Sequence, residues 1–383
     1  MQTRHPARFF AVLLLTLLGG CVSPESWEAT RLLQDIDAAG GPSELKKTTP
    51  APTRTTLRYT VEGRAGLADL YDPRQPLGGA LVLVPGFTEA GKDDRRVVEL
   101  ARSLARARFA VLVPEVPGSR ARRVRLEDRR NIADALVFLR RQRPGIARQG
   151  VGVVAVSYAV GLAVLAAQDV EPDAAPDFLV GIGGYYDTAA VVTFATTGRY
   201  RLPGARLWSR GNPLESAKWI FLASNAAVLE NPQDRIRLEK LGEDCFRGCD
   251  PDATALADDL SAEGRALLAL IVNRNPDRVA GLLTALPKSV AARLEALSLS
   301  RRDLAFLEDR LILVHGRLDP LIPFSESLTL ARAVPGTETF IIDGFSHITP
   351  RGVGWAGQLQ LVDAIQAVLR RRAALPNKGI THD

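Results

Sequence analysis

The sequence predicts an α/β fold with a mostly parallel, doubly wound sheet that a large helical insertion interrupts. Short, continuous apolar runs alternate with amphipathic stretches between residues 80 and 182, as expected of strands buried on both faces and the helices that cover them. This alternation stops after residue 187 and resumes near residue 305. With 383 residues, of which 46% are apolar, the chain can form one large domain with a sizeable insertion.

Eight segments are expected to be strands. Residues 55–62 and 67–71 flank a glycine-containing turn and predict an antiparallel pair. The apolar runs predict six further strands at 80–84, 110–113, 150–156, 178–182, 311–314 and 338–342. Amphipathic or apolar helical patterns lie at 95–108, 126–141, 158–168 and 355–371. Strands that alternate with helices indicate a doubly wound sheet.

The block from residue 188 to residue 304 contains no run typical of a buried strand. Helical patterns cover 216–229, 232–241, 254–273 and 276–286, so the block predicts a helical cap inserted into the core. The core would then consist of residues 55–187 and 305–374, followed by a polar tail at 375–383. The aromatic residues of the block either shape an apolar pocket or form the insertion's own core, which is the commoner use of such residues; they are Phe194, Trp208, Trp219 and Phe221.

The first twenty residues predict an export signal. Arg4 and Arg8 precede an apolar run at 9–18 that is too short to span a bilayer comfortably, which favours a cleaved signal peptide. The run ends in Leu-Gly-Gly-Cys, and this resembles the bacterial lipobox. The resemblance implies that Cys21 is acylated and becomes the first residue of the mature chain. An ordinary signal peptide with an incidental cysteine is the alternative.

The lipobox resemblance also implies a location and an architecture. No Asp follows Cys21, which by resemblance to Gram-negative lipoproteins favours the outer membrane, facing the periplasm, over the inner membrane. A short helical pattern at 27–38 is followed by the Thr- and Pro-rich stretch 48–53, and together they predict that residues 21–54 form a tether that holds the domain off the membrane surface. We therefore expect a lipid-anchored protein of the bacterial cell envelope.

Charge and cysteine content narrow the classes of partner. The formal net charge is +6, but the densest basic stretch, 120–130, contains Glu127 and Asp128, so it indicates a solvated helix face, and we expect no nucleic-acid partner. Cys245 and Cys249 favour a disulfide in an oxidising compartment, with two free thiols as the alternative. Zinc is disfavoured because no histidine lies between residues 21 and 315. We expect no metal or organic cofactor.

Ser157 lies where a predicted strand passes directly into a predicted helix. The segment 150–162 reads GVGVVAVSYAVGL, and Ala155 and Ala159 place small residues two positions on either side of the serine. A nucleophile on such a tight turn needs small neighbours, because larger side chains would collide with adjacent backbone. The alternative is a serine that only caps the helix.

Two later segments make the first interpretation the stronger one. The segment 311–323, LILVHGRLDPLIP, and the segment 343–347, DGFSH, resemble the acid and histidine loops of the α/β-hydrolase family. This resemblance implies a triad of Ser157, Asp319 and His347, in the chain order typical of that fold. His347 is also favoured by elimination, since His5 lies in the signal, His382 lies in the tail and His315 sits at a strand end where packing is its expected role.

Two further assignments come from the same resemblance. Asp187, after the strand at 178–182, is a rival for the acid, but its local motif does not match, so Asp319 is favoured. The loop Val84-Pro85-Gly86-Phe87-Thr88 corresponds to the family's oxyanion loop, with Pro85 where many members have histidine. The resemblance implies that the backbone N–H groups of Phe87 and Tyr158 stabilise the oxyanion.

These residues together predict a serine hydrolase that cleaves a small-molecule acyl substrate, an ester, thioester or amide, through an acyl-enzyme. Acyl transfer with the same triad is one alternative. A non-catalytic lipoprotein that uses a hydrolase-like fold for binding is the other, and the presence of all three triad residues counts against it.

Overall fold

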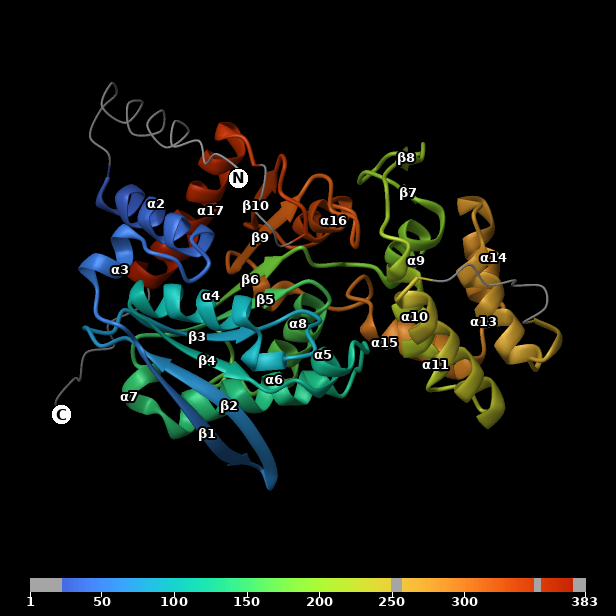
Figure 1. The fold of residues 1–383 in the computed structure, drawn as a ribbon, viewed down its shortest axis with the longest axis horizontal. Helices are drawn as coiled ribbons and strands as arrows, with labels where there is room; N and C mark the ends of the chain where they lie inside the picture. Colours follow the sequence, from blue (N-terminus) through green and yellow to red (C-terminus); the bar gives the residue numbers. More distant parts are fainter. Residues whose placement is uncertain (1–22, 249–256, 348–352, 375–383) are drawn as a thin grey trace, which may run out of the picture.

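The computed structural model describes residues 23–248, 257–347 and 353–374 (Figure 1). Its centre is an eight-stranded sheet in the order β1-β2-β4-β3-β5-β6-β9-β10, in which β2 alone runs against the others. The strands are β1 (Thr53–Val61), β2 (Arg64–Asp72), β3 (Gly79–Val84), β4 (Phe109–Pro114), β5 (Val151–Val156), β6 (Phe178–Ile182), β9 (Leu311–Gly316) and β10 (Glu338–Ile342). The predicted α/β fold with a mostly parallel sheet is confirmed.

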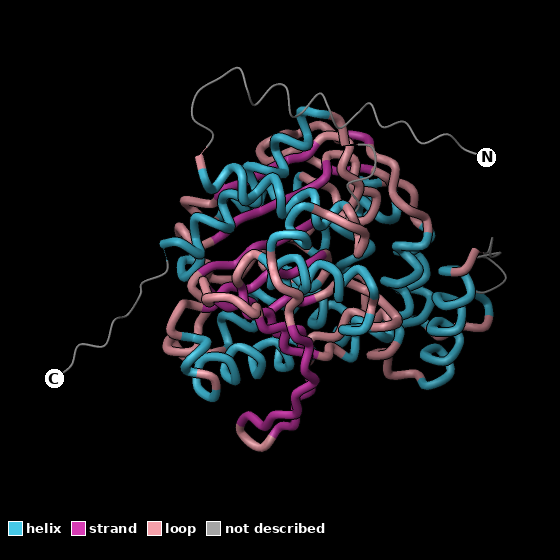
Figure 2. Tube along the Cα trace, turned by 60° about the vertical axis from the view of Figure 1, so that its left-hand side comes forward, coloured by secondary structure: helices cyan, strands magenta, loops and turns pink. Residues whose placement is uncertain are grey.

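The central strands are apolar throughout because both faces of the sheet are covered. In β3, Leu81 and Leu83 enter one apolar core, whereas Val82 and Val84 enter the other, and all four are buried. This is why the central strands could be recognised as continuous runs, and each strand lies within three residues of its predicted limits. The β1–β2 hairpin, by contrast, projects beyond the sheet and is largely exposed at its outer strand (Figure 2).

Helices cover the two faces of the sheet in two separate layers (Figure 1). One layer contains α2 (Pro24–Asp37), α4 (Arg95–Arg106) and α17 (Trp355–Ala374), and the other contains α6 (Asp128–Val137) and α8 (Ala159–Asp169). A π-helical turn, Phe138–Gln142, extends α6. Shorter helices complete the core: α3 (Glu44–Thr48), α5 (Pro117–Ala121), α7 (Pro144–Ala147) and α16 (Ser325–Ala333).

The insertion between β6 and β9 is helical, as predicted, and lies beside the sheet at the right of Figure 1. Its elements are α9 (Thr188–Thr197), β7 (Arg199–Tyr200), β8 (Ser209–Arg210), α10 (Ser216–Ala226), α11 (Pro232–Phe246), α13 (Ala262–Val272), α14 (Val279–Thr284) and α15 (Lys288–Leu297). Trp219 belongs to a separate apolar core formed by these helices, and Phe194 is also buried. These two aromatic residues therefore stabilise the insertion, whereas Trp208 lines a hollow described below.

The prediction of a tether at residues 21–54 is wrong for its central part. Residues 24–48 form α2 and α3, and α2 packs along α17 against the sheet. Ala29, Leu32 and Leu45 are buried in the same core as the central strands. The apolar faces of two short helices outweigh the Thr- and Pro-rich composition that follows them, so only the few residues before β1 remain an extended link.

Asp35 of α2 ties this N-terminal segment to the core by polar contacts. The buried carboxylate accepts hydrogen bonds from Ser103 Oγ of α4 at 2.6 Å and from Lys46 Nζ at 2.6 Å, and also from Ser43 Oγ. Burial raises the pKa of Asp35, but the hydrogen bonds from Lys46, Ser103 and Ser43 outweigh it and leave the pKa below its ordinary value. The ionised carboxylate is therefore part of the folded structure.

Replacing Asp35 with alanine should lower the free energy of unfolding by about 2–4 kcal/mol at pH 7, because its buried donors lose their acceptor. The pKa of Asp35 is lower in the folded than in the unfolded chain. Its contribution to the free energy of unfolding is therefore complete above pH 3.8, the ordinary pKa, and is lost as the pH falls below this value. Urea denaturation at pH 7 and pH 3 measures both effects. Asp37→Ala, an exposed residue of the same helix, should change stability by less than about 0.5 kcal/mol.

Candidate active site

Ser157 occupies a sharp turn between β5 and α8. Its backbone is left-handed, with φ at 61°, a conformation that costs a non-glycine residue roughly 1 kcal/mol and is held here by its neighbours. The Ser157 N–H donates to Ile182 O at 2.7 Å, and Val160 N–H donates to Ser157 O at 3.0 Å. Ala155 and Ala159 are fully buried on either side of the turn, which agrees with the need for small residues there.

The structure brings Ser157, His347 and Asp319 together in one hydrogen-bonded chain. His347 Nε2 lies 2.8 Å from Ser157 Oγ, and His347 Nδ1 lies 2.6 Å from Asp319 Oδ2. The three residues come from the ends of three strands, β5, β9 and β10, which reach the same edge of the sheet because the strands are parallel. Gly183, after β6, leaves room for this arrangement: a Cβ there would lie 3.3 Å from both Asp319 Oδ2 and His347 Nδ1.

The carboxylate of Asp319 is buried, and both of its oxygens accept hydrogen bonds. Oδ1 accepts from Leu321 N–H at 2.8 Å and from Ile322 N–H at 3.0 Å, while Oδ2 faces His347. Burial raises the pKa of Asp319, but the hydrogen bonds from His315 and His347 outweigh it and hold the pKa well below its usual range. Asp319 is therefore ionised at neutral pH, as an acid that orients an imidazole must be.

His315 has a polar role that sequence reasoning missed. The fully buried ring donates from Nε2 to Ile322 O at 2.9 Å, since a carbonyl oxygen can only accept, and the same nitrogen lies 3.3 Å from Asp319 Oδ2. Nδ1 then accepts from Ser327 Oγ at 2.7 Å. The sequence places His315 four residues before Asp319. This spacing alone does not distinguish a histidine that only packs in the core from one that forms hydrogen bonds near the acid.

Asp187, the rival acid, does not contact His347. Its side chain accepts from Ala189 N–H at 2.7 Å and caps the N-terminus of α9. The contact with the imidazole is made by Asp319.

Phe87 and Tyr158 lie next to each other beside the serine. Their rings stack with centroids 4.0 Å apart and an interplanar angle of 17°. Neither backbone N–H donates a hydrogen bond to another described residue, so both remain available to a ligand. Gly86 brings the loop against the turn, because a Cβ there would lie 3.2 Å from the Cβ of Ser157. This arrangement suits a pair of oxyanion donors.

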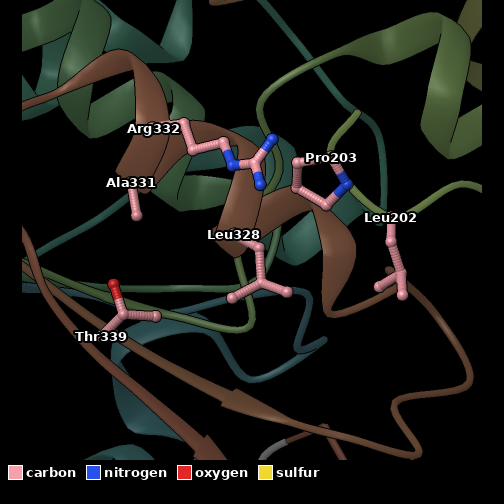
Figure 3. Close-up of a pocket in the computed structure, with 6 residues that line it drawn as sticks. All are labelled: Leu202, Pro203, Leu328, Ala331, Arg332 and Thr339. Carbon is pink, nitrogen blue, oxygen red and sulfur yellow. The ribbon is translucent and has the colours of Figure 1, made fainter. Parts of the chain in front are cut away.

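Two hollows lie near the junction of the core and the insertion. One, of about 540 Å³, is lined by Asp187, Glu326, Tyr200 and Trp208, among others. The second, of about 490 Å³, lies between the segment 202–203 and α16 (Figure 3). The triad residues line neither of them.

One of the three cysteines lies within the described residues. Cys245 is buried in α11 and is disulfide-bonded, whereas Cys249, the partner that the spacing predicts, and Cys21 lie outside the described residues. Within the described part of the chain, no group of three or more His, Cys, Asp or Glu side chains is arranged to hold a metal ion. None of the helices at residues 23–248, 257–347 and 353–374 has the length and apolar character needed to cross a membrane.

Comparison with known proteins gives distant likenesses. No family model matches the sequence, and no curated protein matches it. Among solved structures, the chain is similar to an acylaminoacyl peptidase from Pyrococcus horikoshii, at 11% identity and a TM-score of 0.48, over 88% of this chain and 44% of the peptidase. It is also similar to an arylesterase (13% identity, TM-score 0.46, covering 96% and 98% of the two chains) and to the Francisella virulence factor BioJ (14%, 0.46, 96% and 100%).

The chain spans less than half of the length of the peptidase. The chain nevertheless has the α/β-hydrolase fold, which its own topology defines: an eight-stranded sheet with one reversed strand, a strand-to-helix turn that bears Ser157, and a helical insertion after β6.

Glu326 joins the core to the insertion. This fully buried carboxylate of α16 accepts from Tyr186 N–H at 3.0 Å and from Asp187 N–H at 2.7 Å, where the chain enters the insertion. Burial raises the pKa of Glu326 to about 7 despite these two donors, and the charge of Asp187 raises it further. The folded chain therefore holds a proton on Glu326 more tightly than the unfolded chain does.

Glu326→Gln should change how stability depends on pH. Between pH 4.5, the ordinary pKa, and about pH 7, the wild type should lose stability relative to the variant as the pH rises, because only the native carboxyl stays protonated there. Urea denaturation of both proteins across this range measures the difference. The exposed Glu308→Gln should show no such trend, and a difference for Glu326→Gln that does not vary with pH would contradict the assignment.

Proposed function

We propose that this protein is a serine hydrolase that cleaves an ester, thioester or amide through an acyl-enzyme. The observation that carries the proposal is the continuous hydrogen-bonded chain from Ser157 through His347 to a buried, ionised Asp319. The left-handed turn at Ser157 and the two unengaged N–H groups beside it support the same chemistry.

Each residue then has a defined part in the reaction. His347 Nε2 accepts the proton of Ser157 Oγ while this oxygen attacks the carbonyl carbon of the substrate, and Asp319 stabilises the imidazolium that results. The Phe87 and Tyr158 N–H groups donate to the oxyanion, and such a donor is worth roughly 3 kcal/mol. His347 returns the proton to the leaving group, and water then repeats the sequence on the acyl-enzyme.

We further infer that the protein acts at the bacterial cell envelope, anchored through Cys21 to the outer membrane on its periplasmic side. The lipobox at residues 18–21 supports this inference. Because α2 begins at Pro24 and packs against the core, an acylated Cys21 would be followed by only two residues before the folded domain. The domain would then lie directly on the membrane rather than at the end of a tether.

A fluorophosphonate probe should label the wild type and fail to label Ser157→Ala, because the probe reacts with an activated serine oxygen. Equal labelling of both proteins would exclude Ser157 as the nucleophile. Product analysis on short- and long-chain esters, thioesters and amides, with and without added alcohols or amines, separates hydrolysis from acyl transfer. Absence of turnover by a folded wild type on all of them would favour the non-catalytic alternative.

The two candidate acids provide a matched pair of variants. Asp319→Asn should lower kcat by roughly 10⁴-fold, because the amide cannot stabilise the imidazolium and favours the wrong tautomer. Asp187→Asn should retain nearly full activity, since asparagine caps a helix about as well as aspartate. Steady-state kinetics on any ester that the wild type hydrolyses measures both, and the reverse order of effects would assign the acid to Asp187.

Cys21→Ser should release the protein from the membrane fraction of a bacterial host and abolish incorporation of a labelled fatty acid, because the serine cannot take the thioether-linked lipid. Ser157→Ala provides the control, since it should remain acylated and membrane-bound. Fatty-acid labelling that persists in Cys21→Ser would rule out the anchor.

A further inference from the structure

The loop that carries Phe87 is held in place by polar contacts from several elements. It runs from the end of β3 to the start of α4 and contains one short 3₁₀ turn, Gly91–Asp93. Gly86 O accepts from Ser119 Oγ of α5, and Thr88 N–H donates to Ser119 O at 3.2 Å. Phe87 thus lies between two residues that are hydrogen-bonded to Ser119, and charged side chains contact the loop further along the chain.

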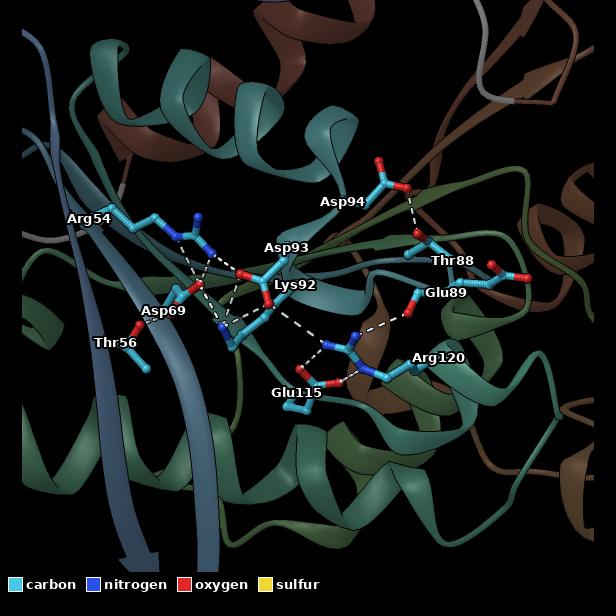
Figure 4. A network of polar contacts seen from close by, with 10 residues as sticks. All are labelled: Arg54, Thr56, Asp69, Thr88, Glu89, Lys92, Asp93, Asp94, Glu115 and Arg120. Atoms are coloured by element: carbon cyan, nitrogen blue, oxygen red, sulfur yellow. Dashed lines mark hydrogen bonds and ion pairs between the residues drawn. The ribbon is translucent and has the colours of Figure 1, made fainter.

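Asp69 of β2 is the centre of those charged contacts (Figure 4). Its carboxylate is completely buried and accepts from Arg54 Nε at 2.9 Å, from Thr56 Oγ1 at 2.7 Å and from Lys92 Nζ at 3.1 Å. Arg54 and Thr56 belong to the neighbouring strand β1, so these two contacts lie within the sheet. Lys92 is the donor that the loop supplies.

Lys92 and Asp93 bind the loop to the sheet with opposite charges. Lys92 is 7% exposed, and besides Asp69 its ammonium group contacts the Asp93 carboxylate oxygens, at 3.3 Å each. Asp93 in turn pairs with Arg54 and lies 3.8 Å from Arg120. The 3₁₀ turn is therefore linked to β1 and β2 by two ion pairs, Lys92–Asp69 and Asp93–Arg54. In the first of them both charges are buried, so each compensates the burial of the other.

Arg120 of α5 contacts the loop on the side opposite Asp69. It forms two hydrogen bonds to the Glu115 carboxylate, at 2.9 and 3.1 Å, and donates from Nη1 to the backbone oxygen of Glu89 at 3.0 Å. Gly91 passes directly against this pair, because a Cβ there would lie 2.9 Å from both Arg120 Nη2 and Glu115 Oε1. The loop thus lies between the charged residues of β1 and β2 on one side and the Glu115–Arg120 pair on the other.

We propose that Lys92 and Asp69 are positioning residues that hold the backbone N–H of Phe87 in the oxyanion hole. The proposal rests on the serine hydrolase function proposed above. An oxyanion donor is effective only when it is already in place as the charge develops, and a misplacement of about 1 Å can cost roughly 10²-fold in rate. The buried Lys92–Asp69 pair ties the loop to the rigid sheet five residues after Phe87.

Lys92→Met tests the proposal, because methionine keeps most of the side chain's length and apolar stem but has neither the charge nor the hydrogen-bond donors of the ammonium group. We expect kcat to fall about 10–100-fold, with KM changed by less than about threefold and the pH midpoint of kcat/KM unchanged, since the Ser157–His347–Asp319 chain is not touched. The rate of fluorophosphonate labelling should fall in parallel. Lys240→Met, which removes an exposed lysine of α11, should leave all four quantities unchanged.

A second variant separates positioning from folding. In Lys92→Met, Asp69 keeps its contacts with Arg54 and Thr56, so the single variant leaves no buried carboxylate without a partner. Asp69→Asn/Lys92→Met removes both members of the pair, and its kcat should stay as low as that of Lys92→Met, because neither residue then ties the loop to β2. Full recovery of kcat in the double variant, or a kcat of Lys92→Met within twofold of the wild type, would overturn the proposal. Either result would show that the pair serves folding alone.

Hydrogen exchange supplies a readout that does not depend on catalysis. Peptides covering residues 85–94 should exchange faster in Lys92→Met than in the wild type, whereas peptides covering β5 and α8 should not change. If the wild type hydrolyses nothing, the proposed function fails, yet exchange still decides whether Lys92 holds the loop. Unchanged exchange in 85–94 would overturn the positioning role on its own.

Discussion

The left-handed backbone at Ser157 is the constraint on which the rest of the site depends. A strand buried on both faces ends there and a helix with a buried first turn begins at Ala159, so the serine is held between two buried elements. The strain of that conformation is offset by the Ser157 N–H bond to Ile182 O in the neighbouring strand. The position of Oγ therefore follows from the sheet, and the histidine and acid loops are arranged around it.

Much of this could be predicted from the sequence, because the strands that carry the site are apolar on both faces and the helices between them are periodic. Ser157 and Asp319 each follow such a strand, His347 follows the partly buried edge strand β10, and local motifs mark all three. The polar role of His315 could not be predicted, since it depends on Ser327 and Ile322, whose loop conformation brings them to the ring. The helical pattern at 27–38 predicts α2 itself, but the linker-like composition that follows it gives no sign that this helix packs on the core.

The contacts behind the Phe87 loop show the same limit more clearly. Asp69 and Lys92 are 23 positions apart, and Arg54 and Asp93 are 39 apart, so no local pattern links them. Each charge alone would indicate an exposed residue. Only the fold of β1 and β2 beside the loop places Asp69 where water is excluded, and burial then makes the partners obligatory.

Two different physical means thus hold the two halves of the proposed reaction centre. The triad is held by backbone topology and by neutral and charge-assisted hydrogen bonds that leave Asp319 ionised. The loop that carries Phe87 has little secondary structure of its own and contacts charged residues from β1, β2 and the region of α5. Because Asp69 and Lys92 are buried, salt screens their attraction far less than that of surface pairs. The loop can therefore be as well fixed as the triad without belonging to the sheet.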